Sequence, residues 1–130
     1  MILLDTSAIY ALADPTDLNH DRALDLFGRA LQGGETFLVH SYVLVEAAAL
    51  LQRRLGLASA FRFLDQANDM EIRWIAGEDH LRAVELLRER GRRGLSLVDC
   101  TSFVVMRRYG VVSALAFDSD FEAEGFSLYA

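Results

Sequence analysis

Lysine is absent from this 130-residue sequence, so all 13 basic residues are arginines. Mechanisms that need an active-site lysine are therefore excluded, among them that of phosphoaspartate receiver domains. Cysteine occurs once, at Cys100, which can form neither an internal disulfide nor, by itself, a thiolate metal site. We expect Cys100 to be a small buried apolar residue. The histidines stand at no recognisable spacing from a nucleophile, which argues against a catalytic triad.

Long apolar runs are also missing. The N-terminal run Ile2–Leu4 is cut by Asp5, far short of a signal peptide or a membrane span. We therefore expect a soluble, cytoplasmic protein with no membrane association. The content of 52% hydrophobic and 25% charged residues is enough for a full core, and no linker or repeat divides the chain. We expect one domain over residues 1–130.

The net charge of −6 is not typical of a general nucleic-acid coating protein, because nonspecific phosphate affinity comes from clustered positive charge. It does not exclude a nuclease, whose metal-binding acids are neutralised by cations in the working enzyme.

Apolar runs alternate with stretches of helical periodicity along the whole chain. This alternation predicts an α/β three-layer sandwich, with a mostly parallel sheet of about four to five strands flanked by helices. Trp74 is expected in the core. The helix expected at 97–109 is almost wholly apolar and should be central. We expect strands near 2–4, 36–39, 72–76, 111–117 and 126–129, and helices near 7–13, 19–32, 41–55, 57–68, 78–93, 97–109 and 119–124.

Four acidic residues interrupt apolar runs. Asp5 follows the first strand, and Asp118 follows the run 111–117. Glu46 and Asp99 are each the only charge within the apolar segments 42–51 and 95–106. A lone buried carboxylate costs several kcal/mol, so four of them need cations. The alternatives are an ordinary helix cap for Asp5, separate arginine salt bridges, or convergence of all four on shared metal ions.

Convergence is favoured by topology, because strand ends and helix starts meet at one edge of a parallel sheet. Glu46 has the longer side chain, which could reach the same crevice from within its helix. Carboxylates without a His or Cys pair at zinc spacing favour Mg²⁺ or Mn²⁺. Such a site activates water for phosphodiester hydrolysis without a protein nucleophile.

In order and spacing, four segments of the sequence resemble the PIN-domain family, and within it the VapC-like ribonuclease toxins of bacterial toxin–antitoxin pairs. They are Leu4-Asp5-Thr6-Ser7, Val45-Glu46, Leu97 to Ser102, and Ala116 to Phe121 followed by Gly125-Phe126.

This resemblance implies a PIN-like fold and an endoribonuclease that cleaves RNA with Mg²⁺ or Mn²⁺. It implies that Asp5, Glu46, Asp99 and Asp118 bind the metal, with Thr6 or Ser7 supporting them by hydrogen bonds. Asp120 is close enough to Asp118 in the sequence to be the fourth ligand instead; we choose Asp118 because it ends the strand. The resemblance also implies a cognate antitoxin and a homodimer. The alternative is a PIN scaffold that binds RNA or protein without cutting.

Two further features concern partners. The dense basic clusters are Arg53-Arg54, Arg90 with Arg92-Arg93, and Arg107-Arg108, and each is either a phosphate contact or a solvated helix end. The first two expected helices carry more apolar residues than one buried face needs, which indicates an interface with an antitoxin or with a second copy. The residues concerned are Ile9, Tyr10, Leu12, Leu24, Leu26 and Phe27.

Overall fold

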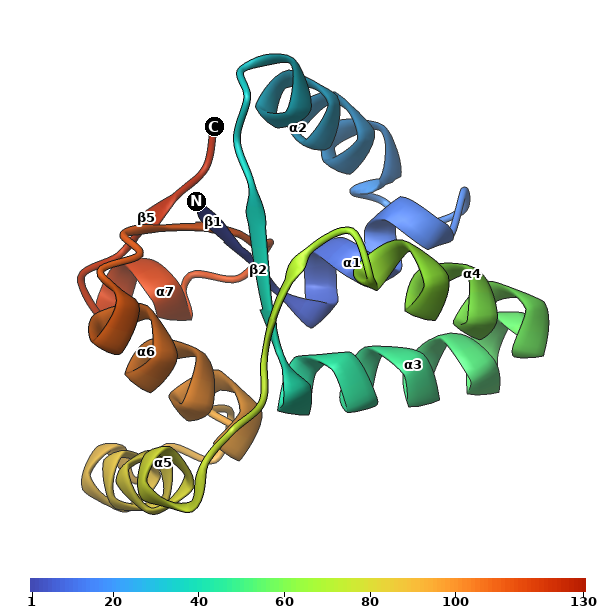
Figure 1. Cartoon of the computed structure of the whole chain (residues 1–130). Coiled ribbons are helices and arrows are strands. Elements are labelled where there is room, and N and C mark those ends of the chain that lie inside the picture. Colours follow the sequence, from blue (N-terminus) through green and yellow to red (C-terminus); the bar gives the residue numbers. More distant parts are fainter.

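The computed structural model describes all residues 1–130. It is an α/β fold in which one sheet separates two layers of helices (Figure 1). The elements are β1 (Ile2–Leu4), α1 (Thr6–Ala13), α2 (His20–Gln32), β2 (Phe37–His40), α3 (Ser41–Leu55), α4 (Leu57–Ala67), β3 (Glu71–Arg73), α5 (Gly77–Arg90), α6 (Leu97–Tyr109), β4 (Ser113–Leu115), α7 (Asp120–Ala123) and β5 (Ser127–Leu128).

The five strands pair in the order β3-β2-β1-β4-β5, and every pairing is parallel. Along the chain, β2 is added beside β1, and β3 beside β2. The chain then crosses back through α5 and α6 to place β4 on the other side of β1. The strand order therefore reverses at β1, and in open parallel sheets the crevice at the carboxyl ends of such strands is where ligands bind.

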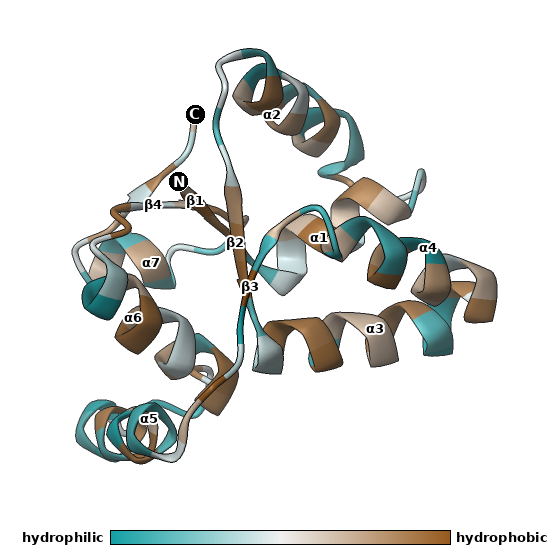
Figure 2. Cartoon of the chain, viewed as in Figure 1, coloured by the Kyte–Doolittle hydropathy of each residue, from teal (hydrophilic) through white to brown (hydrophobic).

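Each face of the sheet packs its own core, as alternation of strand side chains requires. Ile2, Leu4 and Val39 face the layer of α1 to α4, whereas Leu3 and Leu38 face the layer of α5 to α7. Figure 1 shows these two layers on opposite sides of β1 and β2. Figure 2 shows that the strands between the layers consist largely of hydrophobic residues. No helix is both long and apolar enough to cross a membrane.

Helices α3 and α6 begin and end where the sequence predicts. Gly56 ends α3 with a φ of 98°, and Gly110 ends α6 with a φ of 67°, conformations that favour glycine. As expected from its composition, α6 is central: one of its faces is wholly buried, including Phe103, which contacts the rings of Phe121 and Phe126. Cys100 is buried on the same helix, as predicted.

Four details of the prediction are wrong. The strand expected at 72–76 ends at Arg73, because its neighbour β2 ends at His40 and turns directly into α3. Trp74 consequently lies beyond the sheet and is 71% exposed instead of buried. The helix expected to reach residue 93 stops at Arg90, since Gly91 takes a left-handed conformation. The strand expected at 111–117 forms its ladder only over Ser113–Leu115.

Candidate active site

Asp5 stands at the point where β1 ends and α1 begins. It caps α1, because its Oδ2 accepts a hydrogen bond from the backbone N–H of Ser7 at 3.2 Å. The Ser7 hydroxyl donates to the same oxygen at 2.6 Å and accepts from the backbone N–H of Phe117 at 3.1 Å. Ser7 therefore joins the end of β1 to the segment that follows β4. The helix-cap role predicted as one alternative for Asp5 is present, yet it uses only one of the two carboxylate oxygens.

Burial raises the pKa of Asp5 to about 6, although the hydrogen bonds from Ser7 work in the opposite direction. The negative charges of Asp118 and Asp99 raise it further. The pKa of Asp118 is also raised, by partial burial and by the charges of Asp99 and Asp120. Three of the four expected site residues therefore act on one another electrostatically. They come from the end of β1, the start of α6 and the segment after β4, which ends at Leu115, three residues before Asp118.

The carboxylates of Asp99 and Asp118 are half-buried and each keeps one oxygen available. Asp99 Oδ2 accepts from the backbone N–H of Ser96 at 3.0 Å, and Ser96 Oγ accepts from the N–H of Asp99, forming the capping box of α6. Asp118 Oδ1 accepts from the N–H of Asp120 at 2.9 Å. In both residues the second oxygen has no hydrogen-bond donor within the chain.

Glu46 is not buried, contrary to the expectation from its apolar surroundings. The buried face of α3 includes Val43, Leu44, Ala47 and Leu51, and Glu46 lies off this face. It is not among the charges that raise the pKa of Asp5 or Asp118. No three acidic, histidine or cysteine side chains lie close enough together to form a ready metal site. The structure thus brings three of the acids into mutual influence and leaves Glu46 on the solvent side of α3.

Separate arginine salt bridges do not account for these acids, because none of the four takes part in an ion pair. All arginines of the second and third basic clusters except Arg93 bind other acids instead. Arg90 and Arg107 hold Glu124, at 2.6 and 2.9 Å. Arg92 binds Asp120 at 3.1 Å, and Arg108 binds the buried Asp79 at 2.8 Å.

An unpartnered polar atom lies beside Asp5. The Oγ1 of Thr6 is buried and has no hydrogen-bond partner, which is rare for a buried hydroxyl. We expected either Thr6 or Ser7 to support the site by hydrogen bonds, and it is Ser7 that does so. A buried hydroxyl without a partner within the chain indicates a place for a bound water.

His40 contributes a structural link that the sequence did not lead us to expect. Its fully buried ring lies at the end of β2, where Nδ1 accepts from the backbone N–H groups of Tyr42 and Val43 and so caps α3. Its Nε2 lies 2.8 Å from the Oγ of Ser102 in α6, which donates to the carbonyl of Val98. One feature of the sequence could have predicted this role: His40 is a polar residue between an expected strand and an expected helix, the position of a helix cap.

This buried histidine predicts a pH dependence of stability. Burial lowers the pKa of His40 to about 4 from the ordinary value of 6.5. The unfolded chain binds this proton more readily, so stability is fully present above pH 6.5 and falls as the pH drops toward 4, by on the order of 3 kcal/mol.

Asp5, whose pKa is raised, contributes the opposite slope over much of this pH range in wild type and variant alike. The prediction therefore concerns the difference between the two proteins. In urea unfolding, the stability of the wild type relative to His40→Asn, which keeps an acceptor for the α3 cap, should fall as the pH drops. A difference that does not change with pH would show that His40 is not the group responsible.

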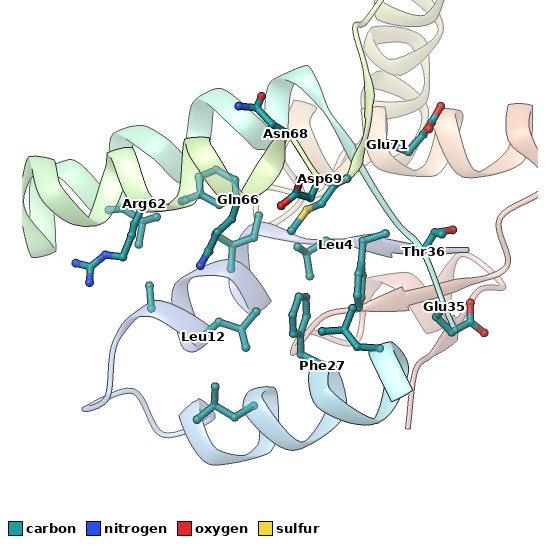
Figure 3. A pocket seen from close by; sticks show the side chains of 18 of the residues that line it. Leu4, Leu12, Phe27, Glu35, Thr36, Arg62, Gln66, Asn68, Asp69 and Glu71 are labelled. Carbon is teal, nitrogen blue, oxygen red and sulfur yellow. The ribbon is translucent and has the colours of Figure 1, made fainter. Parts of the chain in front are cut away.

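The apolar excess of the first two helices lines a cavity of about 780 Å³ between α1, α2 and α4 (Figure 3). Leu12 and Phe27 lie in its middle, Arg62 lies at one end, and Glu35 and Glu71 lie at the other. Leu26 is instead buried in the core. The prediction of an incompletely buried apolar surface on these helices is therefore confirmed, although not for each residue.

The likeness to known proteins covers nearly the whole chain. The PIN domain family model matches residues 2–126. The 23S rRNA-specific endonuclease VapC20 of Mycobacterium tuberculosis is 34% identical over 128 residues, which are 97% of this chain and 95% of that protein, and the same holds for the strains CDC 1551 and H37Rv.

Solved structures agree with this. The crystal structure of M. tuberculosis VapC20, described as a sarcin-ricin loop cleaving toxin, superimposes with a TM-score of 0.85 at 32% identity and covers 97% of this chain and 96% of its own. PAE2754 from Pyrobaculum aerophilum shares the fold with a TM-score of 0.63 at 22% identity, covering 95% and 78%. The chain belongs to the PIN-domain family and, within it, is VapC-like.

Proposed function

We propose that this protein is an endoribonuclease that uses Mg²⁺ or Mn²⁺ to hydrolyse RNA phosphodiester bonds in the cytoplasm, and that it is the toxin of a type II toxin–antitoxin pair. The observation that carries the proposal is Asp5. Its carboxylate is buried at the strand-order reversal, no cation balances it, and two further acids raise its pKa. The 34% identity with an endonuclease supports the same reading.

The donor chemistry of the residues present fits a hard divalent cation, although their side chains are not gathered into a ready site. Asp5, Asp99 and Asp118 offer carboxylate oxygens that lack donors, and oxygen is the ligand that Mg²⁺ and Mn²⁺ prefer. Asp120 fits less well, because its carboxylate already binds Arg92. Glu46 would join from the exposed side of α3 with its longer side chain. We therefore propose Asp5, Glu46, Asp99 and Asp118 as the metal-binding and catalytic acids.

When bound, the ion supplies an activated water and offsets the charge that develops on the phosphate. The protein residues fix the geometry for this chemistry. Ser7 holds Asp5 in place through two hydrogen bonds, and the capping box holds Asp99. The His40–Ser102 hydrogen bond fastens the start of α3 to α6, so that the helices bearing Glu46 and Asp99 are held to one another. The Thr6 hydroxyl is buried and has no hydrogen-bond partner, so we assign it no contact with the substrate.

Purified protein incubated with mixed RNA tests this function. We expect cleavage that EDTA stops and that added Mg²⁺ or Mn²⁺ restores. A protein that binds RNA but cuts none under any metal condition would favour the alternative of a non-cleaving PIN scaffold.

Two of the clustered arginines are candidates for contacting the RNA. Arg53 and Arg54, in the last turn of α3, form no ion pair, whereas most of the other clustered arginines do. Replacing both by glutamine should weaken RNA binding and flatten its salt dependence, by roughly 0.7 in slope for each phosphate that is no longer neutralised. The matched pair Arg107→Gln/Arg108→Gln should instead lower the melting temperature. Filter binding across salt concentrations measures this, and an unchanged slope in the first pair would contradict it.

We propose the cavity between α1, α2 and α4 as the binding site of the antitoxin. It would accept an apolar segment, and Asp69 at its margin has no ion-pair partner to prevent contact with a basic residue. Leu24→Glu, a change at a half-exposed lining residue, should therefore abolish co-purification with the antitoxin while leaving RNA cleavage intact. Light scattering reports whether the same surface holds a homodimer instead. If the variant still bound the antitoxin, the antitoxin would bind another face of the protein and this proposal would be wrong.

A further inference from the structure

Trp74 is the only tryptophan of the chain, and its side chain is 71% exposed. Large aromatic side chains are usually mostly buried, because each removes much apolar surface from water. Trp74 is not on a loose end either. It directly follows β3, and the backbone N–H of the next residue, Ile75, donates to Ser41 Oγ at 2.9 Å. A fixed backbone thus carries an aromatic ring into solvent.

The neighbours of Trp74 indicate which way its ring faces. Arg73 reaches the ring of Tyr109 in α6, with its guanidinium carbon 4.7 Å from the ring centre. Ile75 packs into the core on the same α5–α6 side. Within β3, Ile72 packs on the side of the α1–α4 layer, and the strand alternation continued one residue past Arg73 assigns Trp74 to that same side, which carries α3. Neither a cation nor another aromatic ring stacks on the ring of Trp74, and 71% of the residue is exposed.

The position places Trp74 beside the proposed site. The register pairs Arg73 with His40, so Trp74 stands next to Ser41, the first residue of α3. One turn along α3 from Ser41 is Val45, which is 66% exposed, followed by Glu46. Two strand spacings, roughly 10 Å, separate β3 from β1 and Asp5. Val45 therefore precedes one proposed ligand, Glu46, in α3, and Trp74 lies at the carboxyl edge of the sheet, the edge that also carries Asp5.

We propose that Trp74 is a stacking platform for an unpaired nucleobase of the RNA strand held at the acidic site, with Val45 contacting the edge of that base. Proteins recognise single-stranded RNA by stacking its exposed bases on aromatic rings, which needs an open ring face near the backbone path. Two exposed apolar side chains offer far less area than a protein interface needs. This inference rests on RNA being the substrate, as proposed above.

The single tryptophan makes the test direct, because the fluorescence of the protein's only indole comes from Trp74. A single-stranded RNA oligonucleotide of mixed sequence, titrated into the protein in EDTA, should quench this fluorescence in a saturable manner. The midpoint should match the Kd from anisotropy of labelled RNA. Binding without quenching would overturn the inference.

Variants give the second readout. Trp74→Ala should raise the Kd and the KM for RNA by roughly 5- to 100-fold, with kcat and melting temperature unchanged. Trp74→Phe should restore most of the affinity, because a ring remains. Phe61→Ala, at a 59% exposed aromatic residue of α4, is the matched control and should behave as wild type.

The outcomes distinguish this inference from the proposed function. Wild-type RNA binding by Trp74→Ala, together with normal cleavage, would refute the platform and leave the nuclease assignment standing. Loss of antitoxin binding alone in that variant would make Trp74 a protein contact and equally refute it. Saturable quenching by RNA in a protein that never cuts would support the platform and refute the nuclease.

Discussion

Asp99→Asn should reduce RNA cleavage by roughly 100-fold or more, because even residues that only support metal ligands cost about 10- to 100-fold when they are removed. The fold should survive this change. The amide oxygen can still accept the hydrogen bond that Asp99 Oδ2 receives from the backbone N–H of Ser96, so the capping box of α6 is kept. Cleavage rates at saturating RNA, with circular dichroism as a check of folding, measure the effect.

Asp118→Asn and Asp120→Asn form the matched comparison for this prediction. We expect the first to lose cleavage and the second to retain it, because Asp120 is already held by Arg92 whereas Asp118 has no arginine partner. The reverse result would make Asp120 the fourth ligand. Normal cleavage by Asp99→Asn would remove the basis for a catalytic acid in α6.

Asp5→Asn should raise the melting temperature of metal-free protein at pH 7. With a pKa near 6 against an ordinary value of 3.8, the ionised Asp5 carboxylate destabilises the fold. The folded state binds this proton more tightly than the unfolded chain does, so its destabilising effect is absent below pH 3.8 and complete above pH 6. The gain from the amide is roughly 1–3 kcal/mol, at roughly 4 °C per kcal/mol for a domain of this size. Mg²⁺ or Mn²⁺ should stabilise the wild type much more than the variant, because binding to the native state alone shifts the equilibrium.

Asp79 supplies the control for this effect within the same chain. It is a buried aspartate that does have an arginine, since its Oδ1 lies 2.8 Å from Arg108. Asp79→Asn should lower the melting temperature, and metal should not change that loss. If Asp5→Asn behaves in the same way, destabilised and indifferent to metal, Asp5 is a structural residue and the proposed site is wrong.

The parts of the fold that the sequence predicts best are those with strong, local signals. The apolar composition of α6 and the glycines that follow α3 and α6 predict the positions of those helices in the sequence. These signals are local and do not depend on tertiary contacts. The prediction for Trp74 was wrong because the length of β3 depends on where β2 ends, a pairing between segments far apart in the sequence. Aromatic content alone predicts burial and cannot show that the neighbouring strand has stopped.

The positions of the candidate site residues could likewise be predicted where they depend on local signals. Asp5 and Asp118 follow strands whose parallel pairing places both at one edge, and the structure has that pairing. Glu46 was expected in a buried crevice because its neighbours are apolar, yet it lies off the buried face of α3. The roles of Ser7 and His40 were harder to predict, since each links residues about 60 or more positions apart.

Central to the proposed mechanism is a divalent cation shared by carboxylates from the end of β1, α3, α6 and the segment after β4. Anomalous diffraction from crystals soaked with Mn²⁺ tests for this ion without any substrate. We expect a strong anomalous peak within bonding distance of Asp5, with Asp99, Asp118 or Glu46 completing its coordination, and no such peak in Asp5→Asn crystals. A peak elsewhere on the protein, or none at a saturating Mn²⁺ concentration, would contradict the shared site.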